Sequence, residues 1–235
     1  MKTQITTWQA SLEKSSPEKL LSFFMNQLGK DLILASSLGA EDQVLTDMMI
    51  KIDPKARVFV LDTGRLPNAT YETIAATQKT LGIQYEIYTP PHQALEKLVN
   101  EKGINLFYES IENRKACCYT RKVEPLKRAL STCTAWVTGI RRAQAVTRAS
   151  MPQIDWDEDH QKLKLNPLAY WSQSQVWAYI KDNQVPYHPY HDLNYPSIGC
   201  EPCTRPVKPG EDTRSGRWWW ESPENKECGL HSGQS

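Results

Sequence analysis

Short apolar runs alternate with helical patterns along most of this chain, and this alternation restricts the folds that it can adopt. The runs with the character of buried strands are 31–36, 57–61, 83–88 and 134–140. The helical patterns cover 17–28, 44–49, 67–81, 91–102, 113–130 and 172–182. Strand–helix alternation predicts an α/β fold, a mostly parallel sheet with helices on both faces.

The character of the sequence changes after Arg148. Residues 153–168 are expected to form a hairpin, and the chain from Pro186 is rich in proline, tyrosine and histidine. From Lys208 onward no periodicity is sustained. We therefore predict an α/β domain over 1–207 and a mobile C-terminal tail over 208–235.

Charge and hydropathy restrict the binding partners and the cellular compartment that we expect for this protein. The 235 residues carry a formal net charge of +1, which gives no global field that favours nucleic acid or a membrane surface. No apolar run approaches the roughly 20 residues of a membrane helix, and the N-terminus lacks the apolar core of a signal peptide. We expect a cytoplasmic protein, whose cysteines are reduced and whose close cysteine pairs bind metal or are catalytic.

Four of the six cysteines form two close pairs, Cys117–Cys118 and Cys200/Cys203. Adjacent residues on a helix point about 100° apart, so the tandem pair converges poorly on a zinc ion with bonds of about 2.3 Å. A cluster with several iron atoms can accept neighbouring thiolates on different atoms. We predict one 4Fe–4S cluster per chain, held by these four residues. Structural zinc and plain burial remain the alternatives, and Cys133 is expected to be a buried structural cysteine.

Three loops that follow predicted strands carry small or basic residues. The first, SSLGAED, contains Ser36, Ser37, Leu38 and Gly39 and leads into a helix whose N–H groups can receive a phosphate. The second begins at Leu61 and carries Asp62 and Thr63, which can border an adenine. The third, TGIRR, carries Arg141 and Arg142. Together these loops predict a nucleotide site, since ligands bind at the carboxyl ends of parallel strands.

The C-terminal segment contains a further thiol, Cys228, with His231 three residues later. Thiolate is the reactive form of cysteine, and nearby cations favour it. Cys228 is therefore the candidate nucleophile, and His231 is a candidate to favour the thiolate form of Cys228. Arg214 and Arg217 are candidates to hold an anionic substrate. Arg121 and Lys122, one helical turn after the tandem cysteines, could offset the negative charge of the predicted cluster.

These motifs resemble those of the assimilatory adenylyl-sulfate (APS) reductases, the iron–sulfur branch of the APS/PAPS reductase family. The matching segments are SSLGAEDQV, LDTGRLP, KACCYTRKVEPL, TGIRR, GCEPCTRPV, EDTRSGRWWWE and ECGLH. They occur in the family's order over residues 36–231, with no departure at the motif positions.

The resemblance implies an adenine-nucleotide α-hydrolase-like (Rossmann-like) fold and the reduction of APS to sulfite and AMP, in sulfate assimilation and cysteine biosynthesis. It implies attack by Cys228 on the sulfur of APS, a Cys S-sulfonate, and thioredoxin or glutaredoxin as reductant. The serine loop from Ser36 to Gly39 would follow the phosphosulfate, and Leu61, Asp62 and Thr63 the adenosine. Lys122, Arg142, Arg214 and Arg217 would hold the sulfate, and a homo-oligomer is plausible.

Several alternatives stay open. PAPS, the 3′-phosphorylated form of APS, could be a substrate in addition to APS or in its place. The fold would also suit an ATP-pyrophosphatase-like sulfur-transfer enzyme, although such enzymes usually carry an SGGxDS-like loop where this chain has SSLGAED. A zinc-stabilised nucleotide-binding or regulatory module without catalysis is the remaining alternative.

Overall fold

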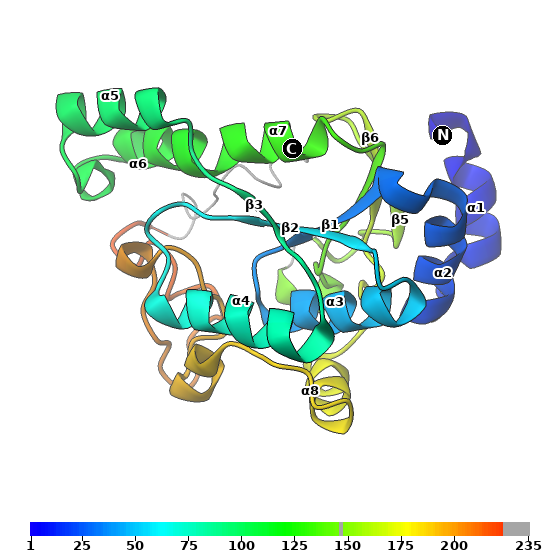
Figure 1. Ribbon diagram of the computed structural model, residues 1–235. Coiled ribbons are helices and arrows are strands. Elements are labelled where there is room, and N and C mark those ends of the chain that lie inside the picture. Colours follow the sequence, from blue (N-terminus) through cyan, green and yellow to red (C-terminus); the bar gives the residue numbers. More distant parts are fainter. Residues whose placement is uncertain (146–147, 223–235) are drawn as a thin grey trace. The chain divides into compact units, whose positions relative to one another are not determined.

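The computed structural model describes residues 1–145 and 148–222 (Figure 1). Their contacts define two compact units. Unit 1 comprises Met1–Val60, Glu72–Glu86 and Leu130–His188, and unit 2 comprises Leu61–Tyr71, Ile87–Ala129 and the described chain from Pro189 onward. The predicted nucleophile Cys228 and its neighbour His231 lie outside the described residues, as do residues 223–235 of the predicted tail.

Six strands form one sheet in the order β3-β2-β1-β4-β6-β5. Their bounds are β1 Leu32–Ser36, β2 Arg57–Leu61, β3 Glu86–Tyr88, β4 Ala135–Val137, β5 Ile154–Asp157 and β6 Lys162–Leu165. The β1–β2, β1–β4 and β4–β6 pairs are parallel, whereas β5 and β6 form an antiparallel hairpin. The predicted mostly parallel sheet is confirmed, and so is the hairpin after Arg148.

The helices follow the predicted alternation. Their bounds are α1 Ile5–Leu12, α2 Pro17–Leu28, α3 Ala40–Ile52, α4 Asn68–Leu81, α5 His92–Lys102, α6 Ile111–Cys118, α7 Glu124–Leu130 and α8 Gln173–Asp182. Within unit 1, α3 lies against β1, and α2 and α8 pack on α3 (Figure 1). Ser16 begins α2 by accepting a hydrogen bond from the Lys19 amide, with Pro17 in the first turn, as the sequence predicts.

The main apolar core lies in unit 1. It is built from Leu34 on β1, Val58 on β2 and Leu165 on β6, each fully buried, together with the inward faces of α2, α3 and α8. Ile33 and Phe59 point to the opposite face of the sheet and are also fully buried. Central strands that are buried on both faces have uninterrupted apolar sequences, which is why they are recognisable without alternation.

Four elements differ from the prediction, among them the third strand, which is limited to Glu86–Tyr88. Helix α1 is missing from the sequence-based assignment, because only Trp8 and Leu12 of it are buried and its apolar stripe is narrow. The helix expected over 113–130 is three consecutive segments, α6, a π-helical turn at Tyr119–Val123 and α7. The fourth strand is limited to Ala135–Val137.

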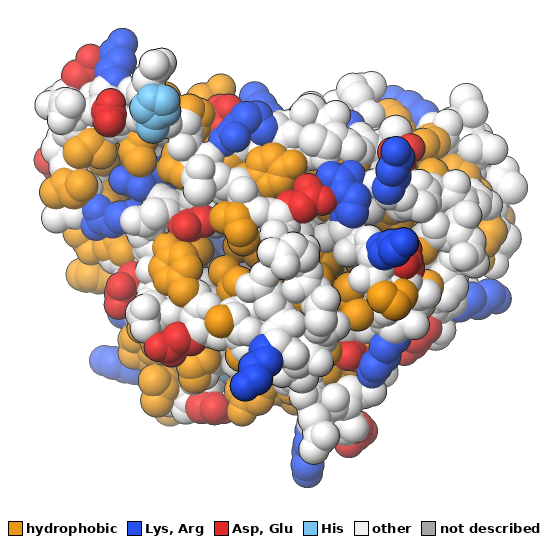
Figure 2. All heavy atoms as spheres, viewed as in Figure 1, with side chains coloured by type: hydrophobic (Ala, Val, Ile, Leu, Met, Phe, Trp, Pro, Cys, Tyr) orange, Lys and Arg blue, Asp and Glu red, His pale blue; other side chains and the backbone are white. Residues whose placement is uncertain are grey.

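Charged side chains of both signs are interspersed over the face shown in Figure 2, with apolar atoms between them. This mixture matches the small formal charge of the sequence. Among the described residues, no helix is both long enough and apolar enough to cross a membrane.

Candidate functional site

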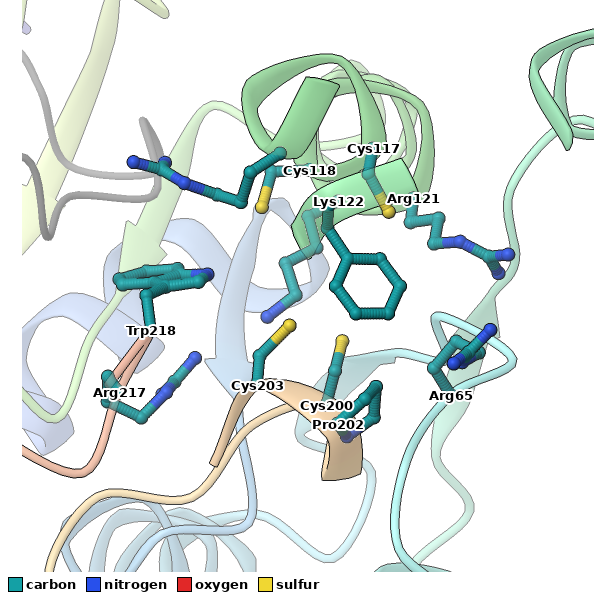
Figure 3. Close-up of a pocket in the computed structure, with 12 residues that line it drawn as sticks. Arg65, Cys117, Cys118, Arg121, Lys122, Cys200, Pro202, Cys203, Arg217 and Trp218 are labelled. Carbon is teal, nitrogen blue, oxygen red and sulfur yellow. The ribbon is translucent and has the colours of Figure 1, made fainter. Parts of the chain in front are cut away.

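Unit 2 contains a pocket lined by both cysteine pairs, Cys117, Cys118, Cys200 and Cys203 (Figure 3). Figure 3 shows the four sulfur atoms turned toward one space, from the end of α6 on one side and from the 200–203 turn on the other. The same pocket is also lined by Arg65, Phe107, Arg114, Arg121, Lys122, Pro202, Arg217 and Trp218. The two cysteine pairs, which lie 82 or more residues apart along the chain, thus line one pocket, as predicted.

Helix α6 presents the tandem pair at its C-terminal end. Ser110 begins this helix by accepting a hydrogen bond from the Asn113 amide at 3.1 Å. After Cys118 the helix widens into a π-turn, in which the Glu124 amide bonds to the Tyr119 carbonyl. A π-turn joins residues five positions apart, and Lys122 lies five positions after Cys117. Lys122 lines the thiol pocket, in agreement with the prediction that it lies beside the cysteines.

The second pair is held in a 3₁₀ turn, Glu201–Cys203. The Glu201 amide donates to the Arg65 carbonyl at 2.8 Å, and the Cys203 amide donates to the Cys200 carbonyl at 3.0 Å. The Trp218 amide in turn donates to the Cys203 carbonyl at 3.1 Å. These backbone bonds hold the main chain of the turn that carries both cysteines.

The four thiols differ in their electrostatic environment. Burial raises the pKa of Cys200, but the Lys122 charge and a contact of 3.2 Å with the Thr63 hydroxyl outweigh it and lower that pKa below its usual value. Burial, followed by the charge of Cys200, raises the pKa of Cys203 to about 12. Burial also raises the pKa of Cys117. Without a bound group, Cys200 is therefore the thiol of these three that ionises most readily.

Buried guanidinium groups surround the thiols. Arg121, 5% exposed, donates from Nη1 to the Thr63 carbonyl at 2.5 Å. Arg217, 8% exposed, donates from Nη1 to the Ser197 hydroxyl and the Ile198 carbonyl at 3.3 and 3.2 Å. The Nε atoms of both arginines are buried and have no hydrogen-bond partner among the described residues. These two Nε–H groups are therefore able to donate hydrogen bonds to an anionic group bound beside the thiols.

The donor set fits an iron–sulfur cluster. All four thiols are free and at least half-buried, soft thiolates are the preferred ligands of such clusters, and cationic side chains offset their negative charge. Within residues 1–145 and 148–222, no group of three or more histidine, cysteine, aspartate or glutamate side chains is arranged to hold a single metal ion. Cys133 lies in unit 1, buried at the start of β4, where its sulfur contacts the Leu130 carbonyl.

The loop of small residues lies in unit 1, between β1 and α3. The Ser36 hydroxyl accepts from the Leu38 amide at 3.1 Å, and Leu38 has a positive φ of 62°. Ser37 donates from both its amide and its hydroxyl to Asp42 Oδ2 at 2.7 Å. Gly39 is the N-cap of α3, so the first N–H groups of that helix face away from its body, as an anion site requires.

Asp42 is a buried carboxyl at the base of this loop. Burial raises its pKa to about 6, although the two bonds from Ser37 act in the opposite direction. Gly139, in the loop after β4, packs directly on it, since a Cβ at position 139 would collide with Asp42 Oδ1. The loops after two neighbouring parallel strands are thus in contact, as the sheet topology predicts.

The two arginines of TGIRR have protein partners in unit 1. Arg141 donates from Nε to Glu41 Oε1 at 2.8 Å. Arg142 donates from Nε to the Met151 carbonyl at 2.6 Å, and its guanidinium stacks on the Tyr170 ring at 4.2 Å. The guanidinium of Arg141 is therefore paired with Glu41, whereas the ring of Tyr170 holds the guanidinium of Arg142 in one orientation.

The remaining predicted residues belong to unit 2. Leu61 ends β2, and Asp62 accepts from the Gly64 amide at 2.8 Å and the Tyr71 hydroxyl at 2.9 Å. Thr63, expected beside an adenosine, contacts the Cys200 sulfur. Arg214 is half-buried, and its amide donates to Asp212.

Arg114 and Trp218 also line the thiol pocket, although no sequence motif predicted them there. Arg114 is fully buried and pairs with Glu221, with Nη2 and Oε2 2.7 Å apart. Its position four residues before Cys118 was a usable signal, because residues at that spacing share a helix face. Glu221 had no comparable signal, since it meets Arg114 from 107 residues further along the chain.

Comparison with known proteins places these features in a family. Residues 31–206 match the family described as phosphoadenosine phosphosulfate reductase domain. A protein of Allochromatium vinosum named adenosine 5'-phosphosulfate reductase is 50% identical over 213 residues, 91% of this chain and 83% of the relative. Proteins of the same name from Burkholderia cepacia and Neisseria meningitidis serogroup B are 51% and 44% identical, over 84% and 86% of this chain and 79% and 82% of the relatives.

Solved structures agree at the level of the fold. The phosphoadenylyl-sulfate (PAPS) reductase of Candida auris, in a phosphate complex, is similar with a TM-score of 0.75 and 27% identity, covering 87% of this chain and 98% of that chain. Yeast FAD synthetase is similar with a TM-score of 0.55 and 12% identity, covering 82% and 66%. The second likeness concerns the fold alone.

Proposed function

This chain belongs to the phosphoadenosine phosphosulfate reductase family, and we propose that it reduces adenylyl sulfate (APS) to sulfite and AMP with thioredoxin or a similar dithiol as electron donor. The main support is the identity of 43–51% with proteins named adenosine 5'-phosphosulfate reductase. As a family member the protein is an oxidoreductase that acts on sulfur compounds. APS is the more specific assignment, and it is the one to test.

Cys117, Cys118, Cys200 and Cys203 would hold one 4Fe–4S cluster. When bound, the cluster would supply a compact anionic centre that orders the surrounding side chains and neutralises part of the local positive charge. The dithiol provides two electrons, which is the number that the conversion of sulfate to sulfite requires. The reaction therefore needs no electron from the cluster.

The proposed substrate contacts fall into two sets. In unit 1, Ser36, Ser37, Leu38 and Gly39 would follow the phosphosulfate, with the first amides of α3 as donors. Arg142 would offer its planar guanidinium to the anion. In unit 2, Leu61, Asp62 and Thr63 would border the adenosine, and Lys122, Arg214 and Arg217 would hold the sulfate oxygens.

The first chemical step is proposed for Cys228. Its thiolate attacks the sulfur of APS, a sulfur–sulfur bond forms, and the bond between sulfur and the bridging oxygen breaks with its electron pair going to AMP. Cations around the sulfate offset the charge that builds up on its oxygens during this attack. His231, three residues from Cys228, would help to keep the thiol ionised.

The second step consumes the dithiol. One thiolate of thioredoxin, or of glutaredoxin, attacks the Cys228 sulfur and displaces sulfite, and the second thiol then releases Cys228 as a thiol. The partner leaves as a disulfide, so its two electrons have reduced the sulfur. The products are sulfite, AMP and oxidised partner.

The deciding experiment is anaerobic purification followed by assays with APS and PAPS side by side, with thioredoxin present. We expect sulfite and AMP from APS, and an SO₃ adduct on Cys228 when the dithiol is omitted. Pyrophosphate release from ATP without sulfite formation would contradict the proposal and favour a sulfur-transfer enzyme. Colourless protein with zinc and no turnover would instead identify a zinc-stabilised module.

PAPS is the second candidate substrate. The family description and the similar Candida auris structure both carry the name of the PAPS enzyme. A kcat/KM for PAPS equal to or above that for APS would assign the dual or PAPS-specific activity. Replacing Cys228 with serine should abolish sulfite formation from either nucleotide, and retained turnover would remove the nucleophile assignment.

A further inference from the structure

A buried ion pair joins helix α6 to the last described stretch of the chain. Arg114 donates from Nε and Nη2 to the two carboxylate oxygens of Glu221, at 2.9 and 2.7 Å. The side chains are only 1% and 4% exposed. Because both charges are removed from water, loss of either partner leaves the other charge buried without its counter-ion, which is unfavourable. The pair is therefore a firm connection within unit 2.

Trp218 strengthens the same connection. Its ring contacts two guanidinium groups, that of Arg114 at 4.9 Å and that of Arg217 at 5.0 Å from the ring centroid. Its side chain is 1% exposed, and its amide donates to the Cys203 carbonyl. The Glu221 amide bonds back to the Trp218 carbonyl at 2.8 Å. Residues 218–221 thus form a clasp that is attached to the segments of both cysteine pairs.

Arg114 also interacts with one of the four thiols, that of Cys118. It precedes Cys118 by four residues on α6, and a hydrogen bond with the Cys118 thiol is among its interactions. Its guanidinium is already engaged by Glu221 and by the Trp218 ring, so it is a poor candidate to hold substrate. Its position instead links a predicted cluster ligand to Glu221.

The clasp lies close in sequence to the proposed nucleophile, because Cys228 is seven residues after Glu221. Seven residues span at most about 25 Å even when fully extended, so the position of Glu221 limits the region that the Cys228 thiol can reach. If the clasp opens, the nearest described attachment is the bridge between Thr204 and Arg217, and the tether to Cys228 lengthens to eleven residues.

We propose that the Arg114–Glu221 pair positions the nucleophile: it fixes the base of the C-terminal segment at the thiol pocket and so couples the order of that pocket to the placement of Cys228. The inference rests on the proposed role of Cys228. The longer tether alone would dilute the thiol only about twofold. Lost orientation has a larger effect, since small displacements of a reacting group slow reactions by up to about 100-fold.

Glu221→Gln tests the proposal, because it keeps the shape of the side chain and removes its charge. In metal-loaded protein without substrate, hydrogen exchange of residues 218–222 should rise about tenfold. Single-turnover formation of the SO₃ adduct at saturating APS should slow about tenfold. Iron and sulfide content should stay at the wild-type level, and APS affinity, measured in a Cys228→Ser background, should change less than about twofold.

The matched control is Glu86→Gln, which removes the partner of Arg57 in unit 1 and should leave exchange at 218–222 and adduct formation unchanged. Arg114→Lys is the second variant: it keeps the charge but loses the two-pronged geometry, so both effects should be smaller and in the same direction.

Three results would overturn the proposal. In the first, Glu221→Gln changes neither the hydrogen exchange of residues 218–222 nor the rate of adduct formation. In the second, adduct formation slows in proportion to a loss of APS affinity. In the third, it slows in proportion to a loss of iron. The second would make Glu221 a substrate-binding residue, and the third a purely structural one. If the wild-type protein forms no adduct on Cys228, the proposed function fails instead, while the exchange data still decide whether the pair anchors residues 218–222.

Discussion

At the scale of single residues, the structure explains why certain small or charged side chains occupy their positions. Asp42 is the clearest case, because it is a carboxyl that is buried without a cationic partner among the hydrogen bonds it makes. It accepts two bonds from Ser37 and leaves no space for a side chain at Gly139. The shape of the loop from Ser36 to Gly39 therefore depends on one carboxyl and one glycine, which belong to different loops.

The first prediction concerns the pH dependence of Asp42. Burial raises its pKa from the ordinary value of 3.8 to about 6, so the folded state binds its proton more tightly than the unfolded state does. The resulting stability is fully present below about pH 4 and is lost as pH rises through 6. In the wild-type protein, the free energy of unfolding should fall by up to about 3 kcal/mol across this window, and Asp42→Asn should abolish that fall. Urea unfolding at several pH values measures it, and parallel wild-type and variant curves would contradict it.

The second prediction concerns Gly139. A methyl group there would collide with Asp42 Oδ1 and lie 2.9 Å from Glu41 Cβ. Gly139→Ala should therefore displace the loop, lower the free energy of unfolding by about 1–3 kcal/mol and weaken nucleotide binding. Urea unfolding and calorimetric titration with AMP check this. Unchanged values in both measurements would show that the loop adapts without cost.

At the scale of elements, the end of α6 determines how the tandem cysteines are presented. The helix begins at a serine cap, ends at Cys118 and continues into a π-turn that brings Lys122 to the pocket. A regular helix would have placed residue 122 differently around the axis, because it joins residues four apart rather than five. The sequence predicted the helix but not the widened turn, since the periodicity of apolar residues does not register a single inserted position.

The third prediction uses the helix caps. Ser110→Ala removes the bond to the Asn113 amide and should destabilise α6 by about 1 kcal/mol, with partial loss of iron during anaerobic purification. Ser16→Ala removes the equivalent bond from α2 in unit 1 and is the matched control, with a similar loss of stability and full iron content. Thermal unfolding and iron analysis measure the two effects. Equal iron content in both variants would contradict the prediction.

At the scale of the molecule, the two units differ in how they are stabilised. Unit 1 holds the large core of the sheet and its helices. Among the described residues, the apolar cluster at the thiol pocket of unit 2 has six buried members, and three of them are Cys117, Cys200 and Cys203. A core in which half of the buried residues are thiols gains little from the hydrophobic effect alone, and small domains of this kind are usually stabilised by a bound metal group.

The fourth prediction arises from this difference. Removal of metal by a chelator should raise hydrogen exchange throughout residues 87–129 and 189–222, while exchange in α3 and β1 of unit 1 stays within about twofold, because binding free energy stabilises the part that binds. Mass spectrometry of loaded and stripped protein measures both regions. Equal exchange in unit 2 before and after stripping would show that the pocket is stable without a bound group.

Local and medium-range features of this protein were determined by its sequence alone. The alternation of strands and helices, the hairpin after Arg148 and the two close cysteine pairs follow from periodicity and residue type, which act over a few positions. Tertiary structure alone decided which distant groups meet: Thr63 with Cys200, Gly139 with Asp42, and Arg114 with Glu221. Such contacts depend on how packed elements place side chains many residues apart, and no local pattern carries that information.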